Sequence, residues 1–103
     1  MKIRAVRIAP NAAPVVVEIE DSLEAMQAEV GGCIECLGIG GKVDAMVNEE
    51  GLLKNLPFNR YLMTPYGPRP FVGTAIVVAH DDEGETIGLS DAQIALTLKA
   101  ASL

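Results

Sequence analysis

The run from Phe71 to His80 is apolar on both of its prospective faces except at Thr74. Such a run is typical of a central strand covered on two sides, or of a strand buried in an interface. At 103 residues the chain has room for one domain with a modest core. The sequence therefore predicts a single domain, residues 1–103, organised around this strand.

Four shorter strands are expected before it. Residues 2–8 are rich in β-branched side chains, but their alternation slips near Ala5, which indicates a bulge or an edge position. Val15–Glu20 alternates well and is expected to form a hairpin with residues 2–8. Cys33–Leu37 and Lys42–Asn48 supply two more strands.

Two helices are expected from their capping signals. Asp21 is a suitable N-cap with Glu24 at the third helical position, and Gly31 with Gly32 would end that helix. Ser90 caps a last helix in the same way. The remaining ranges, 38–41 and 61–70, are rich in glycine and proline and predict a flexible connector and an irregular loop. The fold class is therefore α+β, with a mixed or antiparallel sheet of about five strands and two helices packed on it.

The charge balance limits the classes of partner. A net charge of −6 argues against direct nucleic-acid binding, which relies on lysine and arginine. No apolar run approaches the roughly 20 residues that span a bilayer, and the first residues lack a signal peptide's apolar segment. We therefore expect no membrane association and a cytoplasmic location. The acidic run 81–85 favours a solvated turn over a DNA-mimicking face.

Two features that could carry chemistry have simpler interpretations. Cys33 and Cys36 form a Cys-x-x-Cys pair, but His80 is the only histidine and a zinc site needs four ligands. The pair does not open a helix either, as a redox pair would. We expect two ordinary buried thiols, a His80 that is hydrogen-bonded to a turn, no metal ion and no cofactor.

Polar side chains are densest from Asn48 to Arg60, in Asn-Glu-Glu-Gly-Leu-Leu-Lys-Asn-Leu-Pro-Phe-Asn-Arg. They match no catalytic template, so no catalytic residue is assigned. One interpretation is a turn in which asparagine and glutamate cap backbone amides. The other is a ligand site, with Arg60 as a clamp for a carboxylate or phosphate. The residues expected at that site are Glu35, Asn48, Glu49, Glu50, Asn59 and Arg60.

At these positions the chain resembles an uncharacterised domain-of-unknown-function family that is found mostly in bacteriophages, prophages and bacterial mobile elements. The shared pattern is Gly-Gly-x-Ile-Glu at 31–35, Asn-Glu-Glu-Gly at 48–51, Leu-Pro-x-Asn-Arg at 56–60 and Gly-Thr at 73–74. The cysteine pair is not part of this pattern. The resemblance implies a phage-like origin, hence the cytoplasm of a host cell, and no known reaction.

Three functional hypotheses follow. The first is a non-enzymatic accessory protein that binds a host protein or a small anionic ligand such as a nucleotide, to counter a host system. The second is a small hydrolase or transferase with Glu49 or Glu50 as general base. The third is an acidic structural or DNA-mimic protein. A homo-oligomer is compatible with all three.

Overall fold

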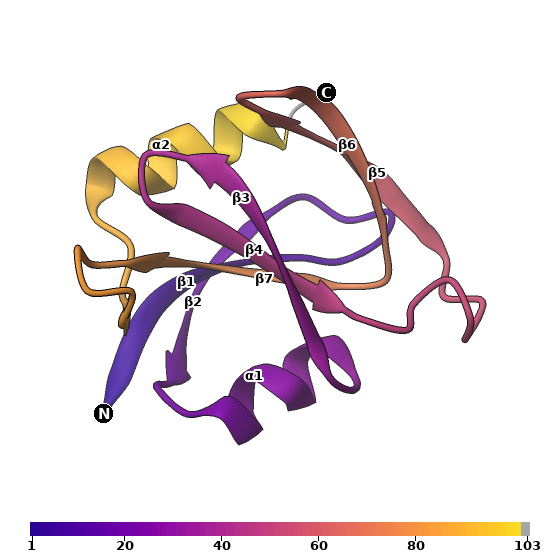
Figure 1. Ribbon diagram of the computed structural model, residues 1–103, viewed down its shortest axis with the longest axis horizontal. Coiled ribbons are helices and arrows are strands. Elements are labelled where there is room, and N and C mark those ends of the chain that lie inside the picture. Colours follow the sequence, from indigo (N-terminus) through magenta and orange to yellow (C-terminus); the bar gives the residue numbers. More distant parts are fainter. Residues whose placement is uncertain (102–103) are drawn as a thin grey trace.

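The computed structural model describes residues 1–101, which form eight strands and two helices (Figure 1). In chain order the elements are β1 (Lys2–Ile8), β2 (Val15–Glu20), α1 (Leu23–Val30), β3 (Ile34–Gly40), β4 (Val43–Asn48), β5 (Phe58–Thr64), β6 (Gly67–Val72), β7 (Ala75–His80), β8 (Thr86–Ile87) and α2 (Asp91–Ala100). The main sheet has the order β2-β1-β7-β4-β3, and β8 pairs with β7; β5 and β6 form a separate two-stranded sheet. Every strand pair is antiparallel, which confirms the predicted α+β class.

The central position of β7 is confirmed, because β7 lies between β1 and β4 and its residues 75–79 are buried. Its start was predicted too early. Phe71 and Val72 belong to β6, and Gly73 separates the two strands with a φ of 71°, in the left-handed region that suits glycine. One apolar run therefore contributes to both sheets.

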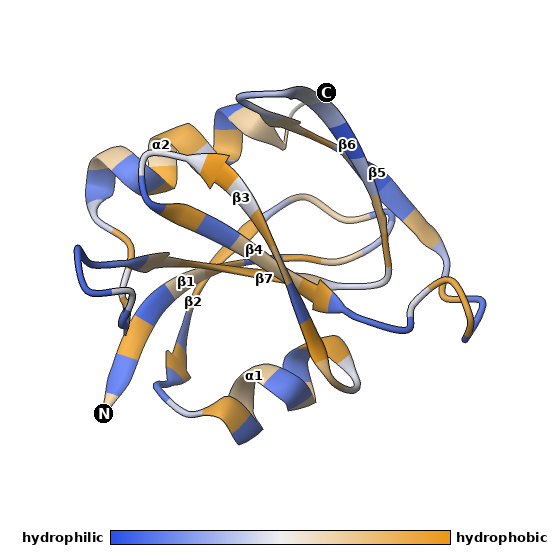
Figure 2. Ribbon diagram, viewed as in Figure 1, coloured by the Kyte–Doolittle hydropathy of each residue, from blue (hydrophilic) through white to orange (hydrophobic). Residues whose placement is uncertain are grey.

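Side chains of the main sheet alternate between two cores. On the upper face in Figure 1, Val77 and its neighbours pack against Leu62 and Phe71 of the β5–β6 hairpin and against α2. On the lower face, Ile76 packs in a second cluster with the buried residues of α1. Figure 2 shows hydrophobic residues concentrated in the strands between these layers.

The slip in the pattern of β1 is not a bulge. β1 pairs continuously with β2 and also pairs with β7, so it is an interior strand, and the predicted β1–β2 hairpin is confirmed. Ala5 and Val6 are both fully buried because they face the two different cores. Two apolar neighbours are thus what an interior strand with two covered faces requires.

The segment 61–70 is not an irregular loop, because most of it forms the β5–β6 hairpin. Pro68 and Pro70 lie in β6 opposite Met63 and Tyr61. Proline cannot donate to a ladder but is tolerated where a strand has a partner on one side only. β6 meets this condition because β5 is its only paired strand among the described residues.

The glycine-rich connector 38–41 is also mostly strand. β3 continues to Gly40 with a register shift between Gly38 and Gly40, and Ile39 is buried. The turn to β4 is made by Gly41 and Lys42, which have φ values of 62° and 60°. Positive φ at both central residues is the geometry of a tight β-hairpin.

The helices are capped almost as expected. Ser22, not Asp21, is the N-cap of α1, since its side chain accepts from the Ala25 amide; Gly31 ends the helix with a φ of 81°. The capping box at Ser90 in α2 is confirmed.

Arg7 of β1 binds Glu29 of α1 through two hydrogen bonds of 2.6 and 2.9 Å. Among residues 1–101, neither helix has the length and apolarity to cross a bilayer.

Candidate functional site

A groove of about 500 Å³ lies where the end of β4 and the turn after it face β6. Its walls are mostly apolar, and three carboxylates and one guanidinium lie among them. The lining residues are Glu35, Leu37, Val47, Asn48, Glu49, Glu50, Leu52, Leu53, Phe58, Arg69, Pro70, Phe71 and Val72. We call this the first groove.

The acidic wall of the first groove is positioned by Asn48. This side chain is buried, donates to the Val30 carbonyl at 3.1 Å and accepts from the Glu50 amide at 2.8 Å. The Glu49 amide donates to the Cys33 carbonyl at 2.8 Å. Asn48 therefore has the turn role of the first interpretation, and both glutamate side chains remain exposed at the groove.

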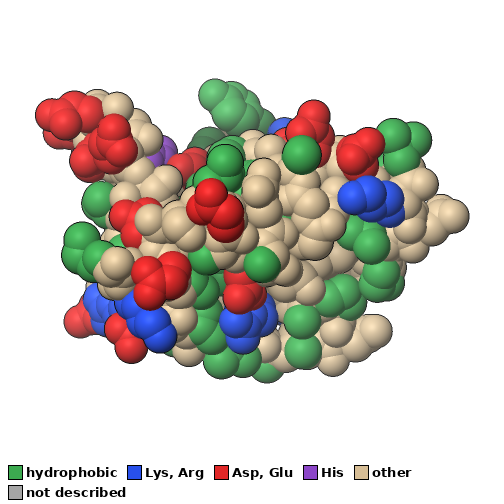
Figure 3. Space-filling model, turned by 90° about the horizontal axis from the view of Figure 1, so that it is seen from below, with side chains coloured by type: hydrophobic (Ala, Val, Ile, Leu, Met, Phe, Trp, Pro, Cys, Tyr) green, Lys and Arg blue, Asp and Glu red, His purple; other side chains and the backbone are tan. Residues whose placement is uncertain are grey.

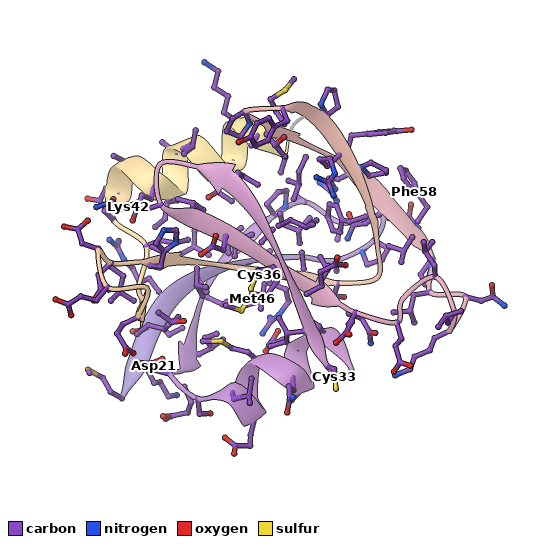
Figure 4. All side chains as sticks on the ribbon, in the orientation of Figure 1. Asp21, Cys33, Cys36, Lys42, Met46 and Phe58 are labelled. Carbon is purple, nitrogen blue, oxygen red and sulfur yellow. The ribbon has the colours of Figure 1, made fainter. Side chains whose placement is uncertain are left out.

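The first groove also has large hydrophobic side chains that are exposed. Leu52 and Leu53 are 80% and 83% exposed, and Phe58 is 53% exposed. Figure 2 shows a hydrophobic stretch within the turn between β4 and β5, at the right of the molecule, and Figure 4 places Phe58 at the start of β5. The Phe58 ring packs edge-on against Tyr61, with centroids 5.6 Å apart.

Glu35, Asn48, Glu49 and Glu50 are brought together in this groove, as the sequence predicted; Asn59 and Arg60 do not line it. Asn59 donates to the carbonyls of Ile8 and Gly73 at 2.9 and 2.7 Å. It therefore ties the hairpin sheet to the end of β1 and to the start of β7.

Arg60 extends the same link. Its Nε donates to the Asn59 side-chain oxygen at 2.8 Å, and its terminal nitrogen donates to the carbonyls of Ala9 and Ala12 in the β1–β2 loop. These partners are neutral oxygens rather than the carboxylates of Glu35, Glu49 or Glu50. The guanidinium binds the protein's own backbone, so the geometry gives the predicted anion clamp no support.

Arg69 is the charged groove residue that was not among the predicted site residues. It lies in β6 and is exposed, and its side chain has no hydrogen-bond or ion-pair partner among the described residues. Its segment was expected to be a loop, so nothing in the sequence placed it opposite the acidic turn. Lys54 is the other cation here, with Nζ 3.9 Å from the Glu50 carboxylate.

A second groove of about 420 Å³ lies on the opposite face of the sheet. It runs between the start of α1, β3 and β4, and the start of β8. The lining residues are Asp21, Ser22, Leu23, Met26, Ile34, Cys36, Met46, Glu85 and Thr86. Its walls also combine apolar side chains with carboxylates, so β3 has an acidic, partly apolar groove on each face.

The two cysteines are exposed, which corrects the expectation of buried thiols. Figure 4 shows Cys36 beside Met46 in the sheet and Cys33 apart from it, just before the start of β3. Partial desolvation raises the pKa of the Cys36 thiol above the usual 9.0, and the nearby Asp44 and Glu35 carboxylates raise it further. Cys36 is thus a poor thiolate at neutral pH.

His80 and the acidic run form a separate surface. The His80 Nδ1 lies 2.6 Å from an Asp44 oxygen on the neighbouring strand β4. The His80 amide donates to the Lys42 carbonyl at 3.0 Å, so the expected hydrogen bond to a turn is made by the backbone. Asp81 accepts from the amides of Glu83 and Glu85, each at 2.9 Å, as in the predicted turn. Figure 3 shows the histidine beside this projecting acidic cluster. No group of three metal-ligating side chains is present within residues 1–101.

The comparison with family models finds one match over residues 1–102, to a domain of unknown function, DUF3846. The comparisons with curated proteins and with solved structures find no match.

Proposed function

We propose that this chain, which belongs to the DUF3846 family of domains of unknown function, is a non-enzymatic binding protein. Its first groove would bind a segment of another protein. The observation that carries the proposal is the exposed pair Leu52 and Leu53 at the rim of an apolar groove. Large exposed apolar side chains grouped at a groove are typical of protein interaction sites. The hydrophobic pair would anchor the contact, and the polar rim would orient it.

The charge of the groove specifies the segment. Glu35, Glu49 and Glu50 line the groove, and Lys54 is the only cation that ion-pairs with any of them among the described residues. Arg60 is engaged elsewhere. Of the described residues that line the groove, Arg69 is the one with a cationic side chain, against three carboxylates. A small anion therefore has less support as the ligand than a segment with apolar side chains and a lysine or arginine.

The biological setting of this proposal is a bacterial host. The sequence motifs resemble a family found mostly in phages and mobile elements, so we propose a host protein in the cytoplasm as the partner. Binding that protein to counter a host system is the role we propose for the complex.

The two other hypotheses stay predictions. For an acid–base enzyme, replacing Glu49 and Glu50 by glutamine one at a time would abolish turnover of its substrate. For a DNA mimic, charge reversal within residues 81–85 would abolish partner binding. The exposed leucines at the first groove have no role in either hypothesis.

The test of the proposed function is recovery of the tagged protein from a bacterial host, followed by native mass spectrometry. We expect a stoichiometric protein partner with wild type that is lost in Leu53→Ala. Leu98→Ala is the matched control, because it removes the same side chain from an exposed position on α2. Equal recovery of the partner by both variants, or no partner with wild type, would contradict the proposal.

A further inference from the structure

The free edge of β3 lies between the two grooves. β3 is the last strand in the order β2-β1-β7-β4-β3, so one of its edges has no strand partner among the described residues. Figure 1 shows β3 crossing the front of the sheet. An unpaired edge presents a row of backbone donors and acceptors that can pair with another strand.

The register identifies the outward groups. Cys33 lies directly opposite Glu49 if the register of Ile34 with Asn48 is extended by one residue, and the Glu49 amide donates to the Cys33 carbonyl. In an antiparallel ladder, hydrogen-bonded and non-hydrogen-bonded pairs alternate. The amides and carbonyls of Ile34, Cys36 and Gly38 therefore point away from β4.

The side chains of β3 alternate between the grooves in the same way. Glu35 and Leu37 line the first groove, whereas Ile34 and Cys36 line the second. An added strand would alternate likewise, with successive side chains entering opposite grooves. The register shift between Gly38 and Gly40 would end the pairing there.

We propose that the partner segment binds as an added β-strand along Ile34–Gly38, with its alternate side chains in the two grooves. This inference rests on the proposed function and specifies its binding mode. Main-chain hydrogen bonds would supply affinity, and the grooves would supply specificity.

Charge decides which strand fits. The first groove contains three glutamates (Glu35, Glu49 and Glu50) against a single cation among its described lining residues, Arg69, and the second contains Asp21 and Glu85. A second copy of this chain would bring the same carboxylates and another net charge of −6 to the edge. An extended segment with alternating apolar and basic residues of another protein is the complementary occupant.

The probe is the capped peptide Lys-Val-Lys-Ile-Lys-Val-Lys, with a glutamate-for-lysine peptide as its charge-reversed control. We expect the lysine peptide to bind at least about tenfold more tightly, which corresponds to about 1.4 kcal/mol. The decisive readout is amide hydrogen exchange by NMR on the wild-type protein. Strand addition slows exchange at Cys36 and Ile34, which face outward, in the saturated complex.

A proline variant tests the same edge by mutation. Cys36→Pro removes an outward amide without removing a bond to β4, and we expect binding to weaken at least about tenfold. Val16→Pro is the control at the free edge of β2, at the other side of the sheet. The Asp21 amide donates to the Met1 carbonyl, so by the same alternation the Val16 amide also points away from β1. Circular dichroism of both variants checks that they fold.

The outcomes separate the two proposals. Suppose that Leu53→Ala abolishes binding, that the bound peptide leaves amide exchange at Cys36 unchanged, and that Cys36→Pro binds the peptide as tightly as wild type. Strand addition would then be overturned, and the proposed function would still stand. Failure of the lysine peptide to bind, or dimerisation of the chain through β3, would also overturn strand addition. Recovery of no host partner with the wild-type protein, or equal recovery of the partner by Leu53→Ala and Leu98→Ala, would be the separate failure of the proposed function.

Discussion

The polar residues between Asn48 and Arg60 divide into those that build the fold and those that face solvent. The side chains of Asn48, Asn59 and Arg60 donate hydrogen bonds to backbone carbonyls of other elements. Glu49 and Glu50 are left exposed at the groove. The sequence showed that the segment was special but could not divide it, because the partners are carbonyls as far away in the chain as Ile8.

Arg60 gives the sharpest prediction at this scale. Arg60→Ala removes donors to Ala9, Ala12 and Asn59, and we expect the free energy of unfolding to fall by about 1–3 kcal/mol. Arg60→Lys should recover only part of this loss, because one ammonium cannot reproduce the planar fork. Urea denaturation measures both.

The control for this prediction is Arg69→Ala, because Arg69 is exposed and makes no described hydrogen bond. Its free energy of unfolding should change by less than about 0.5 kcal/mol. An Arg60→Ala variant as stable as Arg69→Ala would show that the link to the β1–β2 loop contributes nothing to stability.

The ion pair of Glu29 with Arg7 should make the stability of the fold depend on pH. Its hydrogen bonds with Arg7 lower the pKa of the Glu29 carboxyl below 4.5, with burial opposing and the Arg7 charge adding to the shift. Because the folded pKa is the lower one, this stabilisation is full above the unfolded value and is lost as pH falls through the folded value. Wild type should therefore lose more stability than Glu29→Gln as pH falls below about 4.5.

Thermal melts of the two proteins from pH 6 to about pH 2.5 measure this difference. Glu18→Gln is the matched control, because Glu18 is an exposed glutamate on the edge strand β2. A Glu29→Gln profile that runs parallel to the wild-type profile would contradict the prediction.

At the scale of elements, two errors of sequence reasoning occurred at the β5–β6 hairpin and its junction with β7. Phe71 to His80 looks like one strand because it is apolar on both prospective faces, but Gly73 turns the chain from β6 into β7. The prolines of β6 suggested a loop because the sequence does not show that β6 pairs on one side only. The pattern of apolar residues indicates which residues are buried, but it does not indicate in which sheet they lie.

Gly73 provides the prediction for this junction. Its φ of 71° disfavours any other residue, and a Cβ there would lie 2.8 Å from the Leu56 side chain. Gly84→Ala is a matched control, since Gly84 has a φ of 83° and nothing within 4 Å of a Cβ. We expect about 1–2 kcal/mol from the left-handed backbone in both variants, and a further loss only in Gly73→Ala.

Chemical denaturation of both alanine variants separates the two costs. Equal losses in Gly73→Ala and Gly84→Ala would mean that Leu56 moves aside freely. The junction between the two sheets would then not depend on close packing at Gly73.

At the scale of the molecule, the sequence was sufficient for the α+β class, the β1–β2 hairpin, both helices and the central strand. These depend on local patterns and on burial from two sides, which a sequence records directly. The candidate site was predicted in part: its acidic turn is local in sequence, whereas Arg69 and Phe71 reach the groove only through the pairing of β5 with β6. The exposed thiols were missed because β3 is at an edge, a fact of strand order.

The net charge of the protein predicts how salt affects the association rate of the lysine peptide. Fourteen acidic residues against eight basic ones leave −6, and Figure 3 shows carboxylates spread among hydrophobic side chains over the face seen from below. Such a field steers a basic segment toward the protein over distances that salt screens, with a Debye length of about 10 Å at 0.1 M. The association rate of the lysine peptide should therefore fall as sodium chloride rises, while its dissociation rate changes little.

Stopped-flow measurements on two variants separate steering by the whole molecule from contact at the groove. Asp82→Asn removes one charge from the projecting turn, and Glu35→Gln removes one charge at the edge of β3. Both should lower the association rate in low salt, because each weakens the same long-range field. Only Glu35→Gln should raise the dissociation rate, because only Glu35 lies against the bound strand. A dissociation rate that rises equally in both variants would mean that the peptide is held by the charge of the protein and not by the edge of β3.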